Sequence, residues 1–220
     1  MKKYDEIVNI WENDKKHSHW IDSSNKQSWE EVSQAYNKIF DYFFRKYELC
    51  KDKLVDFGSG GGCNIKNLYP FCKEYNAVDI SQNNLDEFKK VIDSYGYSNY
   101  NLIRYNPSYV HLLRRKVNEV DLIVSTAVFQ HFPDFDFSLK ILREFHKMLN
   151  EKGHILIQYR YSEIDREADN YTKNYNYIFG LSFSDKKIKE QLELSNFELL
   201  EICKFKKPSK TYKWLIAKKV

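Results

Sequence analysis

A glycine-rich segment that begins with an acidic residue is the clearest chemical feature of the sequence, Asp56-Phe57-Gly58-Ser59-Gly60-Gly61-Gly62. It follows a short apolar run, Lys53–Phe57, and a helix is expected after it. Glycines between a strand and a helix let backbone N–H groups and the helix N-terminus approach a ligand closely. This glycine loop is therefore the candidate ligand-binding segment.

The spacing of the glycines distinguishes between the known classes of nucleotide-binding loop. A dinucleotide fingerprint has its third glycine three residues after the second, where this sequence has Cys63. No Gly-Lys-Ser/Thr follows, which excludes a nucleoside triphosphate loop. Asp56 stands two residues before the first glycine, and a carboxylate there suits a cationic ammonium group better than a pyrophosphate.

The pattern Asp56-x-Gly58-x-Gly60-x-Gly62 resembles the first signature of the class I, Rossmann-like methyltransferases that depend on S-adenosylmethionine. The resemblance implies that Asp56, Gly58, Ser59 and Gly60 bind the methionine part of that cofactor. We therefore expect S-adenosylmethionine as the methyl donor and S-adenosylhomocysteine as its product.

The resemblance extends along the chain to further cofactor-binding positions. Asp79 ends the second expected strand, next to Ile80, and resembles the family's ribose-binding acid; a helix cap is the alternative role for Asp79. Asn106 stands where the family often has an Asp for the adenine amino group, and an Asn oxygen can still accept that hydrogen bond. Thr126 follows the fourth expected strand and completes the set.

Two histidines are candidates for proton transfer. His131 lies after the fourth expected strand, at the carboxyl edge of the sheet where ligands bind, and could act as the base for an oxygen or nitrogen acceptor. The alternative is that His131 only holds loop backbone. His19 is the second catalytic candidate, in an N-terminal segment that is expected to close over the site as a lid. The alternative is that this segment only packs on the surface.

Four residues are predicted to contact the acceptor. Trp20 belongs to the N-terminal segment, and Gln130 precedes His131. Tyr159 and Arg160 introduce a Tyr-rich insertion at about 160–183, after the fifth expected strand. A guanidinium at Arg160 could pair with a phosphate or carboxylate.

The hydrophobic pattern predicts an α/β fold, with strands alternating with helices from residue 50 onward. We expect a Rossmann-like, seven-stranded, mostly parallel sheet with an antiparallel C-terminal strand and helices on both faces. Residues 1–49 are predicted to form a cap segment and one helix, capped at Ser28, and 50–220 the methyltransferase domain. The expected strands lie at 53–57, 75–80, 100–105, 120–125, 154–159, 197–204 and 212–218.

The composition indicates the cellular compartment and excludes some classes of partner. The net charge of +4 is mild and the basic residues are mixed with acidic ones, so no nucleic-acid partner is expected. The 4 cysteines lack metal or disulfide spacing, which indicates a reducing compartment and no metal site. No apolar run approaches the ~20 residues that span a bilayer. We expect a cytoplasmic monomer or homodimer without a membrane partner.

The predicted function is methyl transfer from S-adenosylmethionine to a small-molecule acceptor, through an oxygen or nitrogen that a phosphorylated or sugar-like metabolite could carry. The alternatives are a protein or RNA methyltransferase and a non-catalytic module that binds S-adenosylmethionine. A nicotinamide oxidoreductase is disfavoured by Cys63 at the third fingerprint position.

Overall fold

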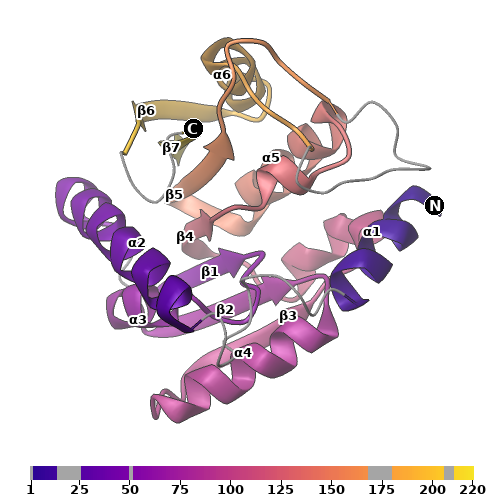
Figure 1. The fold of residues 1–220 in the computed structure, drawn as a ribbon. Coiled ribbons are helices and arrows are strands. Elements are labelled where there is room, and N and C mark those ends of the chain that lie inside the picture. Colours follow the sequence, from indigo (N-terminus) through magenta and orange to yellow (C-terminus); the bar gives the residue numbers. More distant parts are fainter. Residues whose placement is uncertain (1, 14–25, 50–51, 168–179, 206–210) are drawn as a thin grey trace. The chain divides into compact units, whose positions relative to one another are not determined.

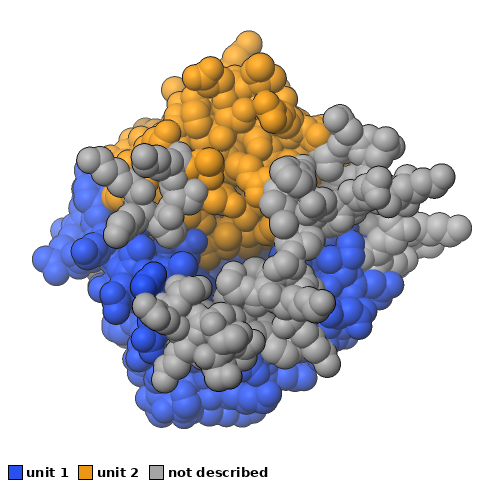
Figure 2. Space-filling view, in the orientation of Figure 1, with its two compact units in different colours: residues 1–109 blue, residues 110–220 orange. Residues whose placement is uncertain are grey.

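The computed structural model describes residues 2–13, 26–49, 52–167, 180–205 and 211–220. The chain divides into two compact units, Met1–Tyr109 and Val110–Val220, which are coloured separately in Figure 2. Each unit is described by itself below, with the element labels of Figure 1.

Unit 1 begins with two helices and continues as a parallel three-stranded sheet (Figure 1). Its β2 pairs with both β1 and β3 in parallel register. The elements of unit 1 are α1 (Lys2–Asn13), α2 (Lys26–Tyr47), β1 (Lys53–Phe57), α3 (Ile65–Leu68), η1 (Tyr69–Phe71), β2 (Glu74–Asp79), α4 (Gln82–Ser94) and β3 (Tyr100–Arg104).

The strands β1 and β2 are buried almost throughout, as parallel strands covered on both faces are. Leu54, Val55 and Val78 are completely buried, and so is the aromatic ring of Phe88 on α4, which lies against β2 and β3. Because the neighbouring strands run in parallel, their carboxyl ends meet at one edge. The glycine loop after β1 and Asp79 at the end of β2 both lie at this edge.

Unit 2 continues the alternation and ends in an antiparallel hairpin. The strand β5 pairs in parallel with β4 and antiparallel with β7, and β6 pairs antiparallel with β7. The elements of unit 2, with η2 starting just before it, are η2 (Pro107–Arg115), β4 (Val120–Ser125), η3 (Phe129–His131), α5 (Phe135–Met148), β5 (Leu149–Arg160), α6 (Asp185–Glu193), β6 (Phe197–Cys203) and β7 (Tyr212–Lys219).

The strand order is β3-β2-β1-β4-β5-β7-β6, with β7 antiparallel to its neighbours. This confirms the predicted seven-stranded, mostly parallel sheet with an antiparallel C-terminal strand. Ser184 caps α6: its hydroxyl accepts a hydrogen bond from the backbone N–H of Lys187 at 3.1 Å.

Three local predictions were wrong. The helix α2 begins at Lys26, so Ser28 lies inside it and is not its cap. A continuous helix is expected after the glycine loop, but α3 is only 4 residues long and a 3-10 turn follows. The strand β5 starts at Leu149, before the expected turn.

The early start of β5 has a physical reason. Leu149 pairs with Val120 and His154 with Leu122, so the residues between them form a bulge within the strand instead of a separate turn. A Cβ on Gly153 would lie 2.8 Å from the Leu149 side chain and 3.0 Å from the Val120 carbonyl oxygen. Only glycine fits there, so the Gly153 that suggested a turn is required by the bulge.

Candidate functional site

The glycine loop of unit 1 is held by backbone geometry that favours glycine. Gly58, Gly60 and Gly62 have φ angles of 74°, 54° and 95°, in the left-handed region that side chains disfavour. The N–H groups of Gly58 and Ser59 donate to the carbonyl oxygen of Val78, at 2.7 and 3.2 Å. The loop is therefore fixed to the end of β2, with its alternate glycines supplying the sharp turns.

The carboxylate of Asp79 connects the end of β2 to the glycine loop. Its Oδ2 accepts the N–H of Gly60 at 2.9 Å, and its Oδ1 accepts the N–H of Ser81 at 2.9 Å and the Asn84 side-chain amide at 3.2 Å. The cap of α4 is Ser81, whose Oγ accepts the N–H of Asn84 at 3.1 Å. Burial raises the pKa of Asp79, and the backbone hydrogen bonds partly oppose that rise.

Asp56 lies beneath the same loop and is completely buried. Its Oδ2 accepts the hydroxyl of Tyr75 at 2.7 Å, and its Oδ1 has no hydrogen-bond partner among the residues that the structure describes. Burial raises the pKa of Asp56 to about 7; the Tyr75 hydrogen bond lowers it and the nearby Asp79 charge raises it. Two buried carboxylates at one loop favour a cation as the ligand.

The other predicted cofactor residues of unit 1 differ in burial and in their hydrogen bonds. Ser59 is 3% exposed, and its Oγ also has no hydrogen-bond partner within the described part of the chain. Ile80 is half-buried next to Asp79, and its carbonyl accepts from Arg104 Nε at 3.2 Å. Asn106 is exposed, and its Oδ1 accepts the N–H of Ser108 at 2.8 Å, which occupies part of its acceptor capacity.

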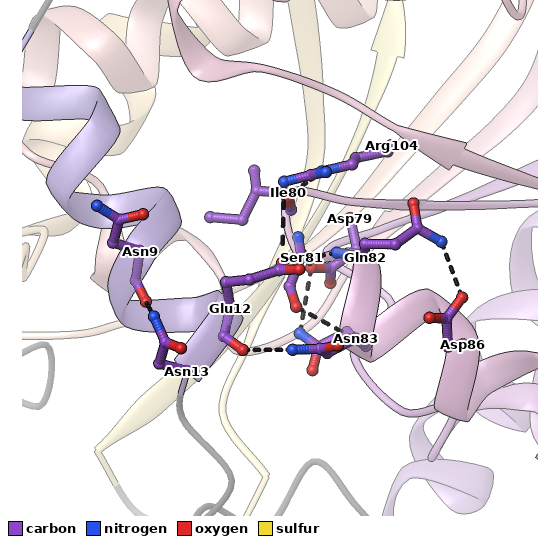
Figure 3. Close-up of polar contacts among 11 residues, drawn as sticks. Asn9, Glu12, Asn13, Asp79, Ile80, Ser81, Gln82, Asn83, Asp86 and Arg104 are labelled. Atoms are coloured by element: carbon purple, nitrogen blue, oxygen red, sulfur yellow. Dashed lines mark hydrogen bonds and ion pairs between the residues drawn. The ribbon is translucent and has the colours of Figure 1, made fainter.

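The C-terminal end of α1 is joined to the start of α4 through Glu12, as Figure 3 shows. The Glu12 carboxylate accepts the N–H of Gln82 at 2.8 Å and lies 3.9 Å from the guanidinium of Arg104. The Glu12 carbonyl accepts the side-chain amide of Asn83 at 2.6 Å. These contacts hold the end of α1 at the start of α4, three residues beyond the end of β2.

In unit 2, the predicted residues after β4 form a compact turn. Thr126 is buried, and Ala127 has a φ of 55°, unusual for a residue with a side chain. Gln130 is 2% exposed, and its Nε2 donates to the Ala127 carbonyl at 2.8 Å and lies 3.2 Å from Nε2 of the half-buried His131. The structure thus brings Gln130 and His131 into direct contact.

The two predicted acceptor residues at the end of β5 differ in exposure. Tyr159 is completely buried, and its hydroxyl donates to Asp185 at 3.0 Å. Arg160 is half-buried, with its guanidinium carbon 6.0 Å from the centre of the Tyr212 ring. Arg160 is therefore the more exposed of the two. His19 and Trp20 lie outside the described residues.

Several residues that position the site were not found from the sequence. Tyr75, Asn84 and Tyr105 all lie next to the two carboxylates, and burial and the Asp79 charge raise the pKa of Tyr105. Gly180 packs directly on the Gln130 backbone, where a Cβ would lie 1.8 Å from the carbonyl oxygen. The hydroxyl of Tyr75 within a buried strand could have suggested a polar partner. Nothing in the sequence around Gly180 indicated its contact with Gln130.

Two observations on the described residues concern metal binding and membrane insertion. They contain no group of three His, Cys, Asp or Glu side chains that could hold a metal ion. None of their helices combines the length and the apolar character needed to cross a membrane. Cys63 and Cys72 are free thiols.

The methyltransferase-domain family matches residues 28–202 of the chain. Because this match covers well over half of the sequence, the chain belongs to that family, which confirms the predicted class I, S-adenosylmethionine-dependent methyltransferase and the prediction of an enzyme. A search of curated proteins found no match.

Solved structures of methyltransferases share the fold. An S-adenosylmethionine-dependent methyltransferase of Clostridium acetobutylicum is 16% identical with a TM-score of 0.66, covering 98% of each chain. One of Leishmania major is 14% identical with a TM-score of 0.76, covering 98% of this chain and 82% of that one. Magnesium protoporphyrin IX methyltransferase of Synechocystis, solved with S-adenosylmethionine bound, is 11% identical with a TM-score of 0.72, covering 100% and 98%.

Proposed function

We propose that this protein transfers a methyl group from S-adenosylmethionine to a small-molecule acceptor with an oxygen or nitrogen nucleophile. The observation that carries the proposal is the pair of buried carboxylates, Asp56 and Asp79, on the two sides of the glycine loop. S-adenosylmethionine has a sulfonium and an ammonium cation near its carboxylate and two ribose hydroxyls. A pair of acids with backbone N–H groups between them complements these groups.

The residues of unit 1 fit this cofactor. The unpartnered Oδ1 of Asp56 and Oγ of Ser59 are buried polar atoms that a ligand could satisfy. The carboxylate of Asp79 would accept the ribose hydroxyls, and Ile80 would line the adenine. Asn106 would offer its oxygen to the adenine amino group. The loop glycines would allow the methionine carboxylate to approach the backbone.

The bound cofactor supplies an activated methyl group, so the protein mainly has to position the acceptor. Thr126 is proposed to contact the cofactor, while His131 and Arg160 serve the acceptor. His131 would contact the nucleophile, and Arg160 would pair with an anionic group such as a phosphate or carboxylate. The name of the Synechocystis relative gives a small molecule as its acceptor, which supports the same substrate class here.

We further propose that residues 1–49 act as a cap on the cofactor end of the site. The support is the Glu12 contact with Gln82 and Arg104, which fixes α1 beside the residues that follow Asp79. His19 and Trp20 follow α1 in the sequence, and we propose them as the catalytic and acceptor-binding residues of this segment.

The cofactor is tested by calorimetry with S-adenosylmethionine and, separately, with NAD. We expect binding of S-adenosylmethionine alone. Binding of NAD without S-adenosylmethionine would overturn the proposal. A turnover screen against phosphorylated, sugar and amine metabolites then detects S-adenosylhomocysteine. Turnover only with RNA or protein substrates would replace the small-molecule acceptor by a macromolecule, and cofactor binding without turnover of any acceptor would favour the non-catalytic module.

The role of Arg160 is tested once an acceptor is found. Arg160→Ala is expected to raise the KM for the acceptor while the affinity for S-adenosylmethionine stays unchanged. Arg115→Ala is the matched control, because Arg115 is an exposed arginine of the same unit. Unchanged acceptor kinetics in Arg160→Ala would remove this residue from the proposal.

A further inference from the structure

The turn after β4 holds a glutamine and a histidine in a contact that restricts the proton position on the histidine. Nε2 of Gln130 donates to the carbonyl of Ala127 at 2.8 Å, and the same nitrogen lies 3.2 Å from Nε2 of His131. The left-handed φ of Ala127, 55°, belongs to the turn that presents this carbonyl to the amide.

The orientation of the Gln130 amide follows from its neighbours. A rotation by half a turn would place the amide oxygen against the Ala127 carbonyl oxygen, two acceptors at hydrogen-bond distance. It would also move the NH₂ group to the place of Oε1, which has no hydrogen-bond partner in the described residues. The rotated amide would thus lose a hydrogen bond and leave two buried donors unsatisfied, so the observed orientation is favoured.

An amide NH₂ group has hydrogens and no lone pair to offer. His131 Nε2, at 3.2 Å from it, must therefore accept the hydrogen bond, and a neutral imidazole then has its proton on Nδ1. We propose that Gln130 is a positioning residue that holds His131 in the Nδ1–H tautomer. This tautomer is the minor form of free histidine in water.

The consequence for the reaction rests on the proposed methyltransferase function. With its Nε2 lone pair engaged by Gln130 and its proton on Nδ1, a neutral His131 offers the acceptor no unengaged lone pair. Proton uptake at Nε2 would set two donors against each other and break the Gln130 contact. His131 would therefore be a poor base, and an acceptor that is nucleophilic without losing a proton to His131 is expected.

The surroundings keep Gln130 in this position. Its side chain is 2% exposed, and Gly180 lies flush against its backbone, with room for no Cβ. Phe129, the preceding residue, is completely buried among the rings of Phe132, Phe145 and Phe183. Packing of Phe129 and of Gly180 therefore holds the Gln130 backbone in place, and a positioning residue requires such support.

The test is the tautomer of His131, read by nitrogen-15 NMR of the uniformly labelled, full-length protein at neutral to alkaline pH. The His131 signals are assigned as those lost in His131→Asn. We expect a pyrrole-like Nδ1 and a pyridine-like Nε2, so that the Nδ1–H form exceeds the Nε2–H form. A wild-type His131 with its proton on Nε2 would overturn the proposal without any variant.

Substitution of Gln130 tests whether this residue sets the tautomer of His131. Gln130→Met keeps the length of the side chain and removes the donor, so the ratio of tautomers is expected to reverse toward Nε2–H. Gln191→Met is the matched control: Gln191 is also buried in unit 2, and its amide is bonded to Ser138 and Phe135. Equal His131 tautomers in wild type and Gln130→Met would show that Gln130 does not set the proton position. Because NMR needs no substrate, a missing methyl-transfer activity leaves this result readable.

Discussion

The backbone N–H of Gly60 donates to the carboxylate of Asp79 at 2.9 Å, across 19 residues of sequence. This hydrogen bond joins the loop after β1 to the end of β2, the two segments assigned to the methionine and ribose parts of the cofactor. Because its acceptor is a carboxylate, this hydrogen bond is charge-assisted and holds the loop against the end of β2.

Asp79→Asn is expected to weaken S-adenosylmethionine binding by about tenfold to a hundredfold. The amide can present NH₂ where Oδ2 accepts from Gly60, and hydrogen bonds to a charged group are worth about 1.5–3 kcal/mol. Calorimetry measures the change. Asp93→Asn is the control, since Asp93 is a carboxylate on the exposed side of α4 bonded to Lys89. Equal affinities of the two variants would contradict the assigned role.

The affinity for S-adenosylmethionine is expected to depend on pH through Asp56. Its pKa of about 7 lies above the ordinary 3.8, so below pH 7 the free protein carries this carboxyl in its neutral form. A cationic ligand favours the ionised form, so affinity should rise about tenfold per pH unit up to pH near 7 and then level off. Calorimetry between about pH 5 and about pH 9 follows this curve.

Two variants identify Asp56 as the source of that curve. Asp56→Asn should bind more weakly, with a flat dependence over the same pH range. Tyr75→Phe removes the hydroxyl whose hydrogen bond lowers the pKa of Asp56, so the midpoint should move to higher pH. A pH dependence that persists in Asp56→Asn would assign the titration to another group.

The sequence was sufficient for the alternating strands and helices from β1 onward and for the two carboxylates, because these depend on local pattern. Strand β1 and strand β4 have the predicted bounds, and Asp56 and Asp79 were both placed at strand ends. The bulge in β5 was not predictable in the same way: Asn150 to Gly153 read as a turn, and only the pairing with Val120 and Leu122 makes them part of the strand.

Contacts between distant segments could not be predicted from one sequence. Tyr75 reads as a core aromatic, and its hydroxyl reaches Asp56 only because β1 and β2 pair in a particular register. Glu12 reads as one surface charge among many, although it bonds to Gln82, 70 residues away. The requirement for glycine at Gly180 depends on the position of the Gln130 carbonyl, which no local pattern specifies.

Glu12→Ala is expected to weaken S-adenosylmethionine binding by about two- to tenfold, since the contacts with Gln82 and Arg104 are partly exposed and worth about 0.5–1.5 kcal/mol. Hydrogen exchange should also become faster in α1. Glu87→Ala is the control, because Glu87 pairs with Lys90 within α4 and leaves α1 alone. If α1 exchanged faster and the affinity did not change, the helix would be no part of the cofactor cap.

Gly180→Ala is expected to lower both stability and turnover. Its φ is ordinary, so the cost comes from space: the new Cβ would lie 1.8 Å from the Gln130 carbonyl oxygen and 3.0 Å from the carbonyl carbon, and one of the two segments must move. Overpacking of this kind costs about 1–3 kcal/mol, which urea unfolding measures. Movement of Gln130 should also disturb His131 and lower kcat.

The control for this variant is Gly96→Ala. At Gly96 the backbone conformation disfavours alanine but there is room for a Cβ, whereas at Gly180 the conformation is ordinary and there is no room. A Cβ on Gly96 meets nothing within 4 Å, but its φ of +71° disfavours alanine by about 1–2 kcal/mol. Both variants should therefore lose stability, while only Gly180→Ala loses turnover at a temperature where each is folded. Full turnover in folded Gly180→Ala would mean that the turn after β4 tolerates displacement, and the position of His131 would then matter little to the reaction.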